Sequence, residues 1–177
     1  MKATPMRVHF IAFLFAACSD STQDLVDAST ADAPYDTARC LITGHYGALG
    51  TKSGTPTLGA TTLSVTLDGG PPRDAFFIKL TAGKGAFAGG PLKSGTYPLA
   101  GADLDFTNCG LCVNIIADIG AMGPQKFYFA DSGTVTLTAT QPPAGSLSSV
   151  TFKEVTSTGV PVANGCVASI TSLAFSM

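Results

Sequence analysis

The chain has 177 residues, a formal net charge of −2 and only 12% charged residues, and it contains no tryptophan. A near-neutral chain with scattered lysines has no basic stripe, which argues against a nucleic-acid-binding protein. The absence of tryptophan removes the side chain on which sugar-binding platforms most often depend, although three tyrosines remain in residues 39–177.

The first predicted element is an export signal over residues 1–17. Lys2 and Arg7 precede a ten-residue apolar run from Val8 to Ala17, which ends in small residues. A charged start, a short apolar core and a small-residue cleavage site are typical of a secretory signal. A spanning helix would need about 20 apolar residues. A buried N-terminal helix is the alternative, but a polar, aspartate-rich stretch follows at once.

The end of this run, LFAAC at residues 14–18, resembles the lipobox of bacterial lipoproteins. The resemblance implies that Cys18 carries acyl chains such as palmitate and becomes the first mature residue. Ser19, where the inner-membrane retention signal would have aspartate, favours the outer membrane, on its periplasmic side or at the cell surface. Several acyl chains would anchor the protein firmly, at about 0.8 kcal/mol per buried CH₂. A plain secretory signal, and hence a secreted protein, is the alternative.

Residues 18–38 are predicted to be an acidic flexible linker. They contain five aspartates, no basic residue and few large apolar residues, so they cannot bury enough surface to fold. Removing Lys2 and Arg7 with the signal leaves a net charge of −4. From residue 39 onward eight basic and seven acidic residues nearly cancel, so the acidity belongs to the linker.

Residues 39–177 have the length of one domain, and period-two alternation recurs along them. Turn-forming Gly, Pro, Asn and Asp residues separate the alternating segments, and no segment has apolar residues at helical spacing. The strands are predicted at 40–49, 61–67, 75–80, 95–100, 112–118, 126–131, 134–140, 149–155 and 166–175. About nine strands at short intervals predict an all-β fold, an antiparallel sandwich or jelly roll, with a closed β-barrel as the alternative.

The stretch KFYFADSGTVTLTAT, residues 126–140, predicts a β-hairpin. Phe127 and Phe129 alternate with Tyr128, and a threonine-rich alternating run follows Gly133. A short loop that ends in glycine fits a hairpin with a bulge, so we place the turn at residues 131–133.

Four cysteines remain after processing, and an even number in an exported chain predicts disulfides. They are Cys40, Cys109, Cys112 and Cys166. If residues 109–117 are extended, Cys109 and Cys112 point to opposite faces, so we favour a bond from each to Cys40 or Cys166. Gly110 permits a turn, and a local Cys109–Cys112 bond stays open. A thioredoxin-like redox pair is expected at the start of a helix, and a four-cysteine zinc site usually has two close pairs of cysteines. Here the single close pair opens a predicted strand, so both alternatives are disfavoured.

Asp103 and Asp105 are the best candidates for a ligand site. On a strand, side chains two apart share a face, so both carboxylates could bind calcium with Asn108 or backbone carbonyls. A solvated loop explains them equally well. His45 is the only histidine of the mature chain, and an outward strand or loop position is the simpler prediction for it. Without a G-x-S-x-G or H-E-x-x-H motif, catalysis would depend on these residues.

From Cys40 to Phe175 the order of motifs resembles a group of uncharacterised envelope lipoproteins from myxobacteria and their relatives. The resemblance rests on GTYPL, FTNCGLCVNI, FYFADSGTVTLT, SSVTFKEV and GCVASITSLAF. It implies an envelope location and a cysteine-rich β-domain but no reaction. We therefore predict a cell-envelope lipoprotein, attached to the membrane by its lipid, that binds an unidentified protein or glycan or has a structural role. A small secreted hydrolase or a calcium-dependent carbohydrate-binding module is the alternative.

Overall fold

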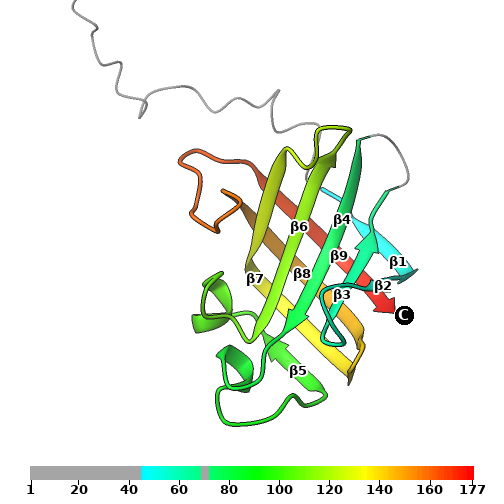
Figure 1. The fold of residues 1–177 in the computed structure, drawn as a ribbon, viewed down its shortest axis with the longest axis vertical. Helices are drawn as coiled ribbons and strands as arrows, with labels where there is room; N and C mark the ends of the chain where they lie inside the picture. The colour runs from blue at the N-terminus through cyan, green and yellow to red at the C-terminus, as the bar shows by residue number, and fades with distance from the viewer. Residues whose placement is uncertain (1–44, 69–71) are drawn as a thin grey trace, which may run out of the picture. The chain divides into compact units, whose positions relative to one another are not determined.

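The computed structural model describes residues 45–68 and 72–177, and this part of the chain contains no α-helix. It folds into nine β-strands and two short 3₁₀-helices, η2 and η3 (Figure 1). The strands are β1 (Ala48–Ser53), β2 (Thr55–Pro56), β3 (Thr62–Thr66), β4 (Arg73–Leu80), β5 (Gly95–Pro98), β6 (Leu111–Ile119), β7 (Lys126–Thr140), β8 (Pro143–Val155) and β9 (Val167–Ser176); η2 is Gly85–Phe87 and η3 is Gly101–Leu104. The predicted all-β class is confirmed.

All nine strands belong to one sheet. Its order is β1-β9-β8-β7-β6-β4-β3-β2, and β5 pairs with the second half of β7. The sheet curls over on itself, so that β4 and β6 cross in front of β8 and β9 in Figure 1. The single sheet is nearly closed and barrel-like, so it is consistent with both predicted architectures, the sandwich and the barrel.

The two ends of this sheet are brought together by a single segment. β1 runs parallel to the last strand, β9, and after one residue the chain continues as β2, which pairs with β3. That residue is Gly54, whose N–H donates to the Ser176 carbonyl oxygen at 2.7 Å. A Cβ at this position would lie 2.6 Å from the Ser64 carbonyl oxygen, so only glycine fits between β1 and β2.

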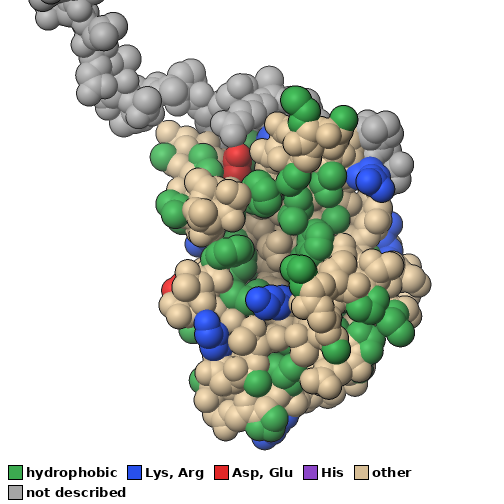
Figure 2. Space-filling view, in the orientation of Figure 1, with side chains coloured by type: hydrophobic (Ala, Val, Ile, Leu, Met, Phe, Trp, Pro, Cys, Tyr) green, Lys and Arg blue, Asp and Glu red, His purple; other side chains and the backbone are tan. Residues whose placement is uncertain are grey.

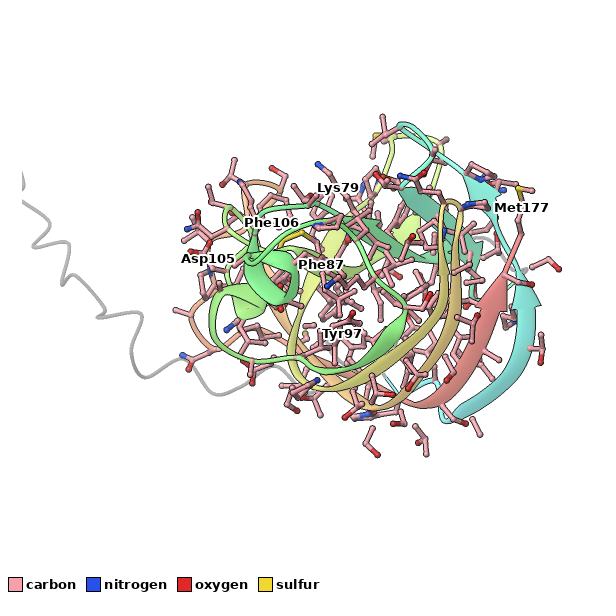
Figure 3. The ribbon with its side chains drawn as sticks, turned by 90° about the horizontal axis from the view of Figure 1, so that it is seen from below. Lys79, Phe87, Tyr97, Asp105, Phe106 and Met177 are labelled. Atoms are coloured by element: carbon pink, nitrogen blue, oxygen red, sulfur yellow. A yellow bond between two sulfur atoms is a disulfide. The ribbon has the colours of Figure 1, made fainter. Side chains whose placement is uncertain are left out.

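The core fills the inside of the curl. Inward side chains of β4, β6, β8 and β9 alternate with outward ones, as the period-two pattern predicts. Phe76 on β4 and Phe175 on β9 meet across the interior, with ring centroids 5.6 Å apart. Near η2 and η3, Phe87 and Tyr97 pack edge to face at 5.3 Å inside the curl (Figure 3).

The predicted hairpin at residues 126–140 is wrong, because these residues form one continuous strand, β7. The residues assigned to the turn instead interrupt the register with β8, between Ala130 and Thr134. Gly133 has a φ of 127°, and a Cβ there would lie 2.6 Å from the Val150 Cα. Irregular pairing bends a strand. Residues 131–133 thus bend β7, which contributes to the curl of the sheet, and they do not reverse the direction of the chain.

A buried carboxylate ties three elements together at one end of the sheet. Asp74 on β4 accepts hydrogen bonds from the Tyr46 hydroxyl at 2.7 Å and from the Asp118 N–H at 2.8 Å. Its own N–H donates to the Asp68 carboxylate at 3.0 Å. Burial raises the pKa of Asp74, and burial together with the Asp74 carboxylate raises the pKa of Tyr46. The pair fastens the start of the described chain to β4.

Candidate functional site

The carboxylates of Asp103 and Asp105 do not face each other, because they do not lie on a strand. Asp103 belongs to η3 and is only 3% exposed, while Asp105 follows η3 and is exposed. The geometry that we assumed for a shared calcium site is therefore wrong. Calcium binding itself stays a prediction, and in the described residues no three His, Cys, Asp or Glu side chains form a group that could hold a metal ion.

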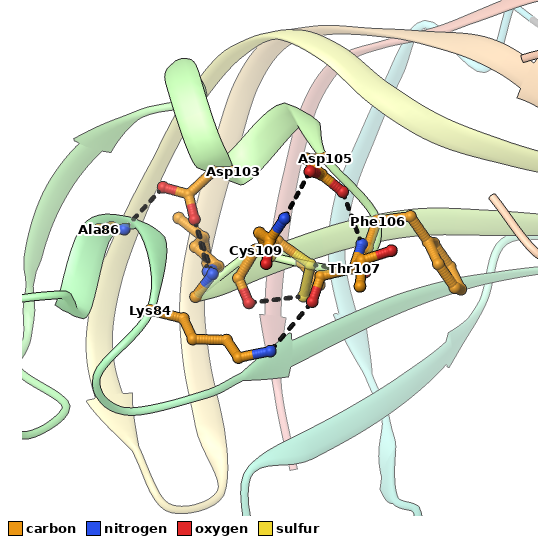
Figure 4. Close-up of a disulfide and its surroundings, with 11 residues drawn as sticks. Lys84, Ala86, Asp103, Asp105, Phe106, Thr107 and Cys109 are labelled. Carbon is orange, nitrogen blue, oxygen red and sulfur yellow. Dashed lines mark hydrogen bonds between the residues drawn. A yellow bond between two sulfur atoms is a disulfide. The ribbon is translucent and has the colours of Figure 1, made fainter. Parts of the chain in front are cut away.

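Asp103 organises the loops around the start of β6. One carboxylate oxygen accepts from the Gly110 and Leu111 N–H groups at 2.9 Å each, and the other accepts from the Ala86 N–H at 2.8 Å (Figure 4). A Cβ on Gly110 would collide with the Lys84 carbonyl group. A carboxylate with three backbone donors is a structural tie between η2, η3 and β6.

Asp105 caps the turn that leads into the C-x-x-C motif. Its carboxylate accepts from the Asn108 side chain at 2.7 Å and from the Thr107 N–H at 2.8 Å. These hydrogen bonds, that of the Asn108 side chain first, lower the pKa of Asp105. The Lys84 ammonium group donates to the Thr107 carbonyl oxygen at 3.0 Å from the other side. The turn therefore has a fixed shape.

The C-x-x-C motif contains a local disulfide, Cys109–Cys112, with Cα atoms 5.2 Å apart (Figure 4). Our preferred pairing of each with a distant cysteine is wrong, because β6 begins only at Leu111 and Cys109 lies in the preceding turn. Cys166 is also disulfide-bonded. Cys40 and the proposed lipidation site Cys18 lie outside the described residues, as do the predicted signal and linker at residues 1–38.

The outward side chains of β6 and of the start of β7 form an unusual surface, which we name the β6–β7 face. It consists of Asn114, Ile116, Phe127 and Phe129, and Phe129 is only 1% exposed. The inward neighbours Ile115 and Tyr128 are buried in the main core. These strands are thus apolar on both sides, whereas a sheet with one solvated face normally alternates with polar residues.

Two loops cover part of the β6–β7 face. Phe106 comes from the capped turn and packs edge to face on Phe129, with centroids 5.5 Å apart, yet it stays 44% exposed. Gly159, in the loop between β8 and β9, lies so close that a Cβ would collide with the Phe106 ring. The disulfide cysteines pack beside Phe129 in the same small cluster. The disulfide therefore supports the turn that places Phe106.

A groove of about 230 Å³ remains between these covers, and we name it the β6–β7 groove. Hydrophobic side chains gather around a hollow on this side of the molecule (Figure 2), and Figure 3 shows Phe106 outside the curl of the sheet. No residue of the lining carries a charge. The lining residues are Phe106, Asn114, Ile116, Phe127, Tyr128, Phe129, Val155, Thr156 and Ser157.

His45 lies elsewhere, beside β9. Its ring Nδ1 is 2.8 Å from the Ser169 hydroxyl oxygen, and the side chain is exposed. This agrees with the outward, hydrogen-bonded position predicted from the sequence. In the described residues the Asp103 carboxylate accepts hydrogen bonds from the backbone N–H groups of Ala86, Gly110 and Leu111, so the structure does not join His45 to it as a catalytic pair.

Comparison of the chain with protein-family models, with curated proteins and with solved structures found no match. A search of the described residues for a helix long and apolar enough to cross a membrane also found none. The function is therefore argued from the chain's own residues.

Proposed function

We propose that the protein is a cell-envelope lipoprotein that acts by binding, and that the β6–β7 groove is its binding site. The observation that carries the binding role is a concave, uncharged, aromatic-lined groove on strands whose other face already fills the core. Sites for small ligands and side chains are concave and mostly apolar, with a few polar groups for orientation. The polar groups here are Asn114, Thr156 and Ser157.

The location rests on separate support. The N-terminal sequence has the order of an export signal and a lipobox ending at Cys18. Disulfides persist in oxidising compartments outside the cytosol, and the local Cys109–Cys112 bond and the bonded Cys166 are consistent with such a compartment. The lipid on Cys18 would hold the domain at the outer membrane, with a linker in between.

Binding at the groove can be tested with N-phenyl-1-naphthylamine, a neutral apolar dye whose phenyl ring can enter the groove and whose fluorescence rises when it leaves water. The wild-type domain should raise its fluorescence, and Ile116→Arg should abolish the signal because the long charged side chain enters the groove. Thr171→Arg, an exposed position on β9, is the matched control and should behave as wild type. Equal signals from all three proteins would sink the assignment of the groove.

The anchor is tested independently by the intact mass of the mature protein. Acylated Cys18 predicts a mass increase over the cleaved polypeptide and accumulation of the precursor in globomycin. An unmodified mature mass with globomycin-insensitive processing would identify a secreted protein instead.

A further inference from the structure

In the described residues, the half-buried polar side chain of the β6–β7 groove, Asn114, has no hydrogen-bond partner. Asn114 pairs across the sheet with Phe77 on β4 and with Phe129 on β7, so aromatic residues flank it on both sides. In the part of the chain that the structure describes, its side-chain amide makes no hydrogen bond. The amide offers two N–H donors and a carbonyl acceptor side by side. A ligand that fits here should present a complementary acceptor and donor.

The size of the groove restricts that ligand. At about 230 Å³ it is smaller than the roughly 300–1,000 Å³ of sites for drug-sized molecules. It can hold a single ring with its neighbouring atoms, and an oligosaccharide or a complete lipid would exceed it. The uncharged lining would leave a charged group desolvated and unpaired, so the ligand must be neutral.

The walls favour an aromatic ring. Phe106 and Phe129 already meet edge to face, with an interplanar angle of 72°, and Phe127 lines the same groove. Aromatic rings prefer such tilted contacts at centroid distances of about 4.5–7 Å. A further ring in the groove would extend this arrangement, and Phe106, being half exposed, can adjust to it.

We propose that the groove binds one neutral aromatic side chain of a peptide segment from a partner protein, with the main-chain N–H and C=O groups of that aromatic residue paired to the Asn114 side chain. The main-chain N–H and C=O groups of one extended residue lie on the same side of the chain, so they supply the donor and the acceptor that complement the carbonyl and N–H groups of the Asn114 side chain. Recognition would then follow the general division in which backbone groups fix the segment and a pocket selects the side chain. This inference rests on the proposed binding function and specifies its ligand.

The probe is N-acetyl-L-phenylalaninamide, which carries one phenyl ring and two amides and no charge. Titration followed by NMR should give a dissociation constant on the order of 1 mM, as expected for so small a ligand. N-acetyl-L-aspartamide and glucose should bind at least about tenfold more weakly, because neither places an aromatic ring against the phenylalanines.

Asn114→Leu separates the peptide part of the proposal from simple apolar binding. It should weaken N-acetyl-L-phenylalaninamide about tenfold, which is the effect of losing one or two hydrogen bonds, and leave toluene binding unchanged. Thr136→Val, a half-buried threonine on the second half of β7, is the control and should change neither titration. Thermal unfolding of both variants would verify that they fold.

Each of the remaining outcomes would overturn one part of the proposal: the peptide assignment, the aromatic class of the ligand or the binding role itself. Equal loss of toluene and N-acetyl-L-phenylalaninamide, or no effect of Asn114→Leu, would overturn the peptide assignment. Tighter binding of 1-octanol or glucose would overturn the aromatic class and leave the binding role intact. If the naphthylamine dye also failed to bind, the proposed function itself would be wrong.

Discussion

The two halves of β7 present opposite kinds of outer surface, although they belong to one strand. Its first half contributes Phe127 and Phe129 to the β6–β7 face, while its second half presents the half-buried threonines Thr134 and Thr136 on the outer face. These threonines belong to an outer surface rich in hydroxyl groups, which we name the hydroxyl face and which continues through Ser146 and Ser148 on β8 to Ser169 on β9. Hydroxyl groups pair across it, as in Ser132 and Thr151, whose hydroxyl oxygens are 2.7 Å apart. Water can form hydrogen bonds with the hydroxyl face, whereas the apolar β6–β7 face is stabilised when other residues cover it and exclude water.

The loops in front of β6 provide part of that cover, and they explain where the strongest polar contacts of the domain lie. Asp103, Asp105 and the Cys109–Cys112 bond all shape the segment that places Phe106 over Phe129. In the described residues no loop held by a buried carboxylate or a disulfide covers the hydroxyl face in this way.

Truncation of a ring on the apolar face should cost far more than truncation of a hydroxyl residue on the same strand. Phe129→Ala should lower the free energy of unfolding by about 3 kcal/mol, because it leaves a cavity beside Val155 and the disulfide. Thr136→Ala, which loses only the contact of its hydroxyl with Thr96, should cost less than about 1 kcal/mol. Urea unfolding curves of both variants would measure the difference; equal losses would contradict it.

Of the two neighbouring aspartates, only the buried one should matter greatly for stability. Asp103→Ala removes the acceptor for three N–H groups and should cost about 3 kcal/mol. Asp105→Ala removes an exposed carboxylate and serves as the matched control, with a smaller loss. A larger loss for Asp105→Ala, measured in the same unfolding experiment, would show that the exposed turn and not the buried tie holds the cover.

Removal of the local disulfide should have a moderate effect on stability. Cys109→Ser with Cys112→Ser opens a loop of only four residues, so the chain-entropy model gives about 2 kcal/mol. The loss should be accompanied by weaker dye binding in the groove, since the turn that carries Phe106 is released. If stability fell by that amount and dye binding stayed unchanged, the disulfide would have no part in shaping the groove.

The smallest effect concerns the polar tie at the far end of β4. Burial raises the pKa of Asp74, so the folded state holds this proton more tightly than the unfolded state. The stability contributed by the group is complete below the ordinary aspartate pKa of about 3.9 and is lost as pH rises through the raised folded-state pKa. Relative to Asp74→Asn, the wild type should therefore lose stability as pH rises above about 4. An unchanged difference between pH 3 and pH 7 would contradict this.

The sequence predicts β3, β4, β6 and β9 closely, because the alternation of residues such as Leu63 and Val65 directly reflects which face is buried. It misses most of β1, all of β2 and the start of β8. It fails at residues 131–133, because aspartate, serine and glycine are favoured both in turns and in bulges, and only the pairing of β7 with β8 distinguishes the two. It also misplaced the bonds of Cys109, because the point at which β6 begins depends on the amide contacts of Asp103.

The groove could have been suspected from one signal. The stretches CVNII and KFYF have apolar residues on both faces, which is unusual for strands that we expected to be half solvated. What the sequence could not supply is the identity of the cover. Phe106 and Gly159 are about 50 residues apart in the chain, and only the folded loops bring them into contact over Phe129.

The most direct test of the account is the position of N-acetyl-L-phenylalaninamide on the isotope-labelled protein, observed through intermolecular nuclear Overhauser effects. The account predicts contacts from the ligand ring to the Ile116 methyl groups and the Phe106 ring, and none to the Thr136 methyl group. Contacts to the hydroxyl face, or none to Ile116 at a saturating ligand concentration, would contradict the claim that the apolar outer face of β6 and β7 is the binding surface.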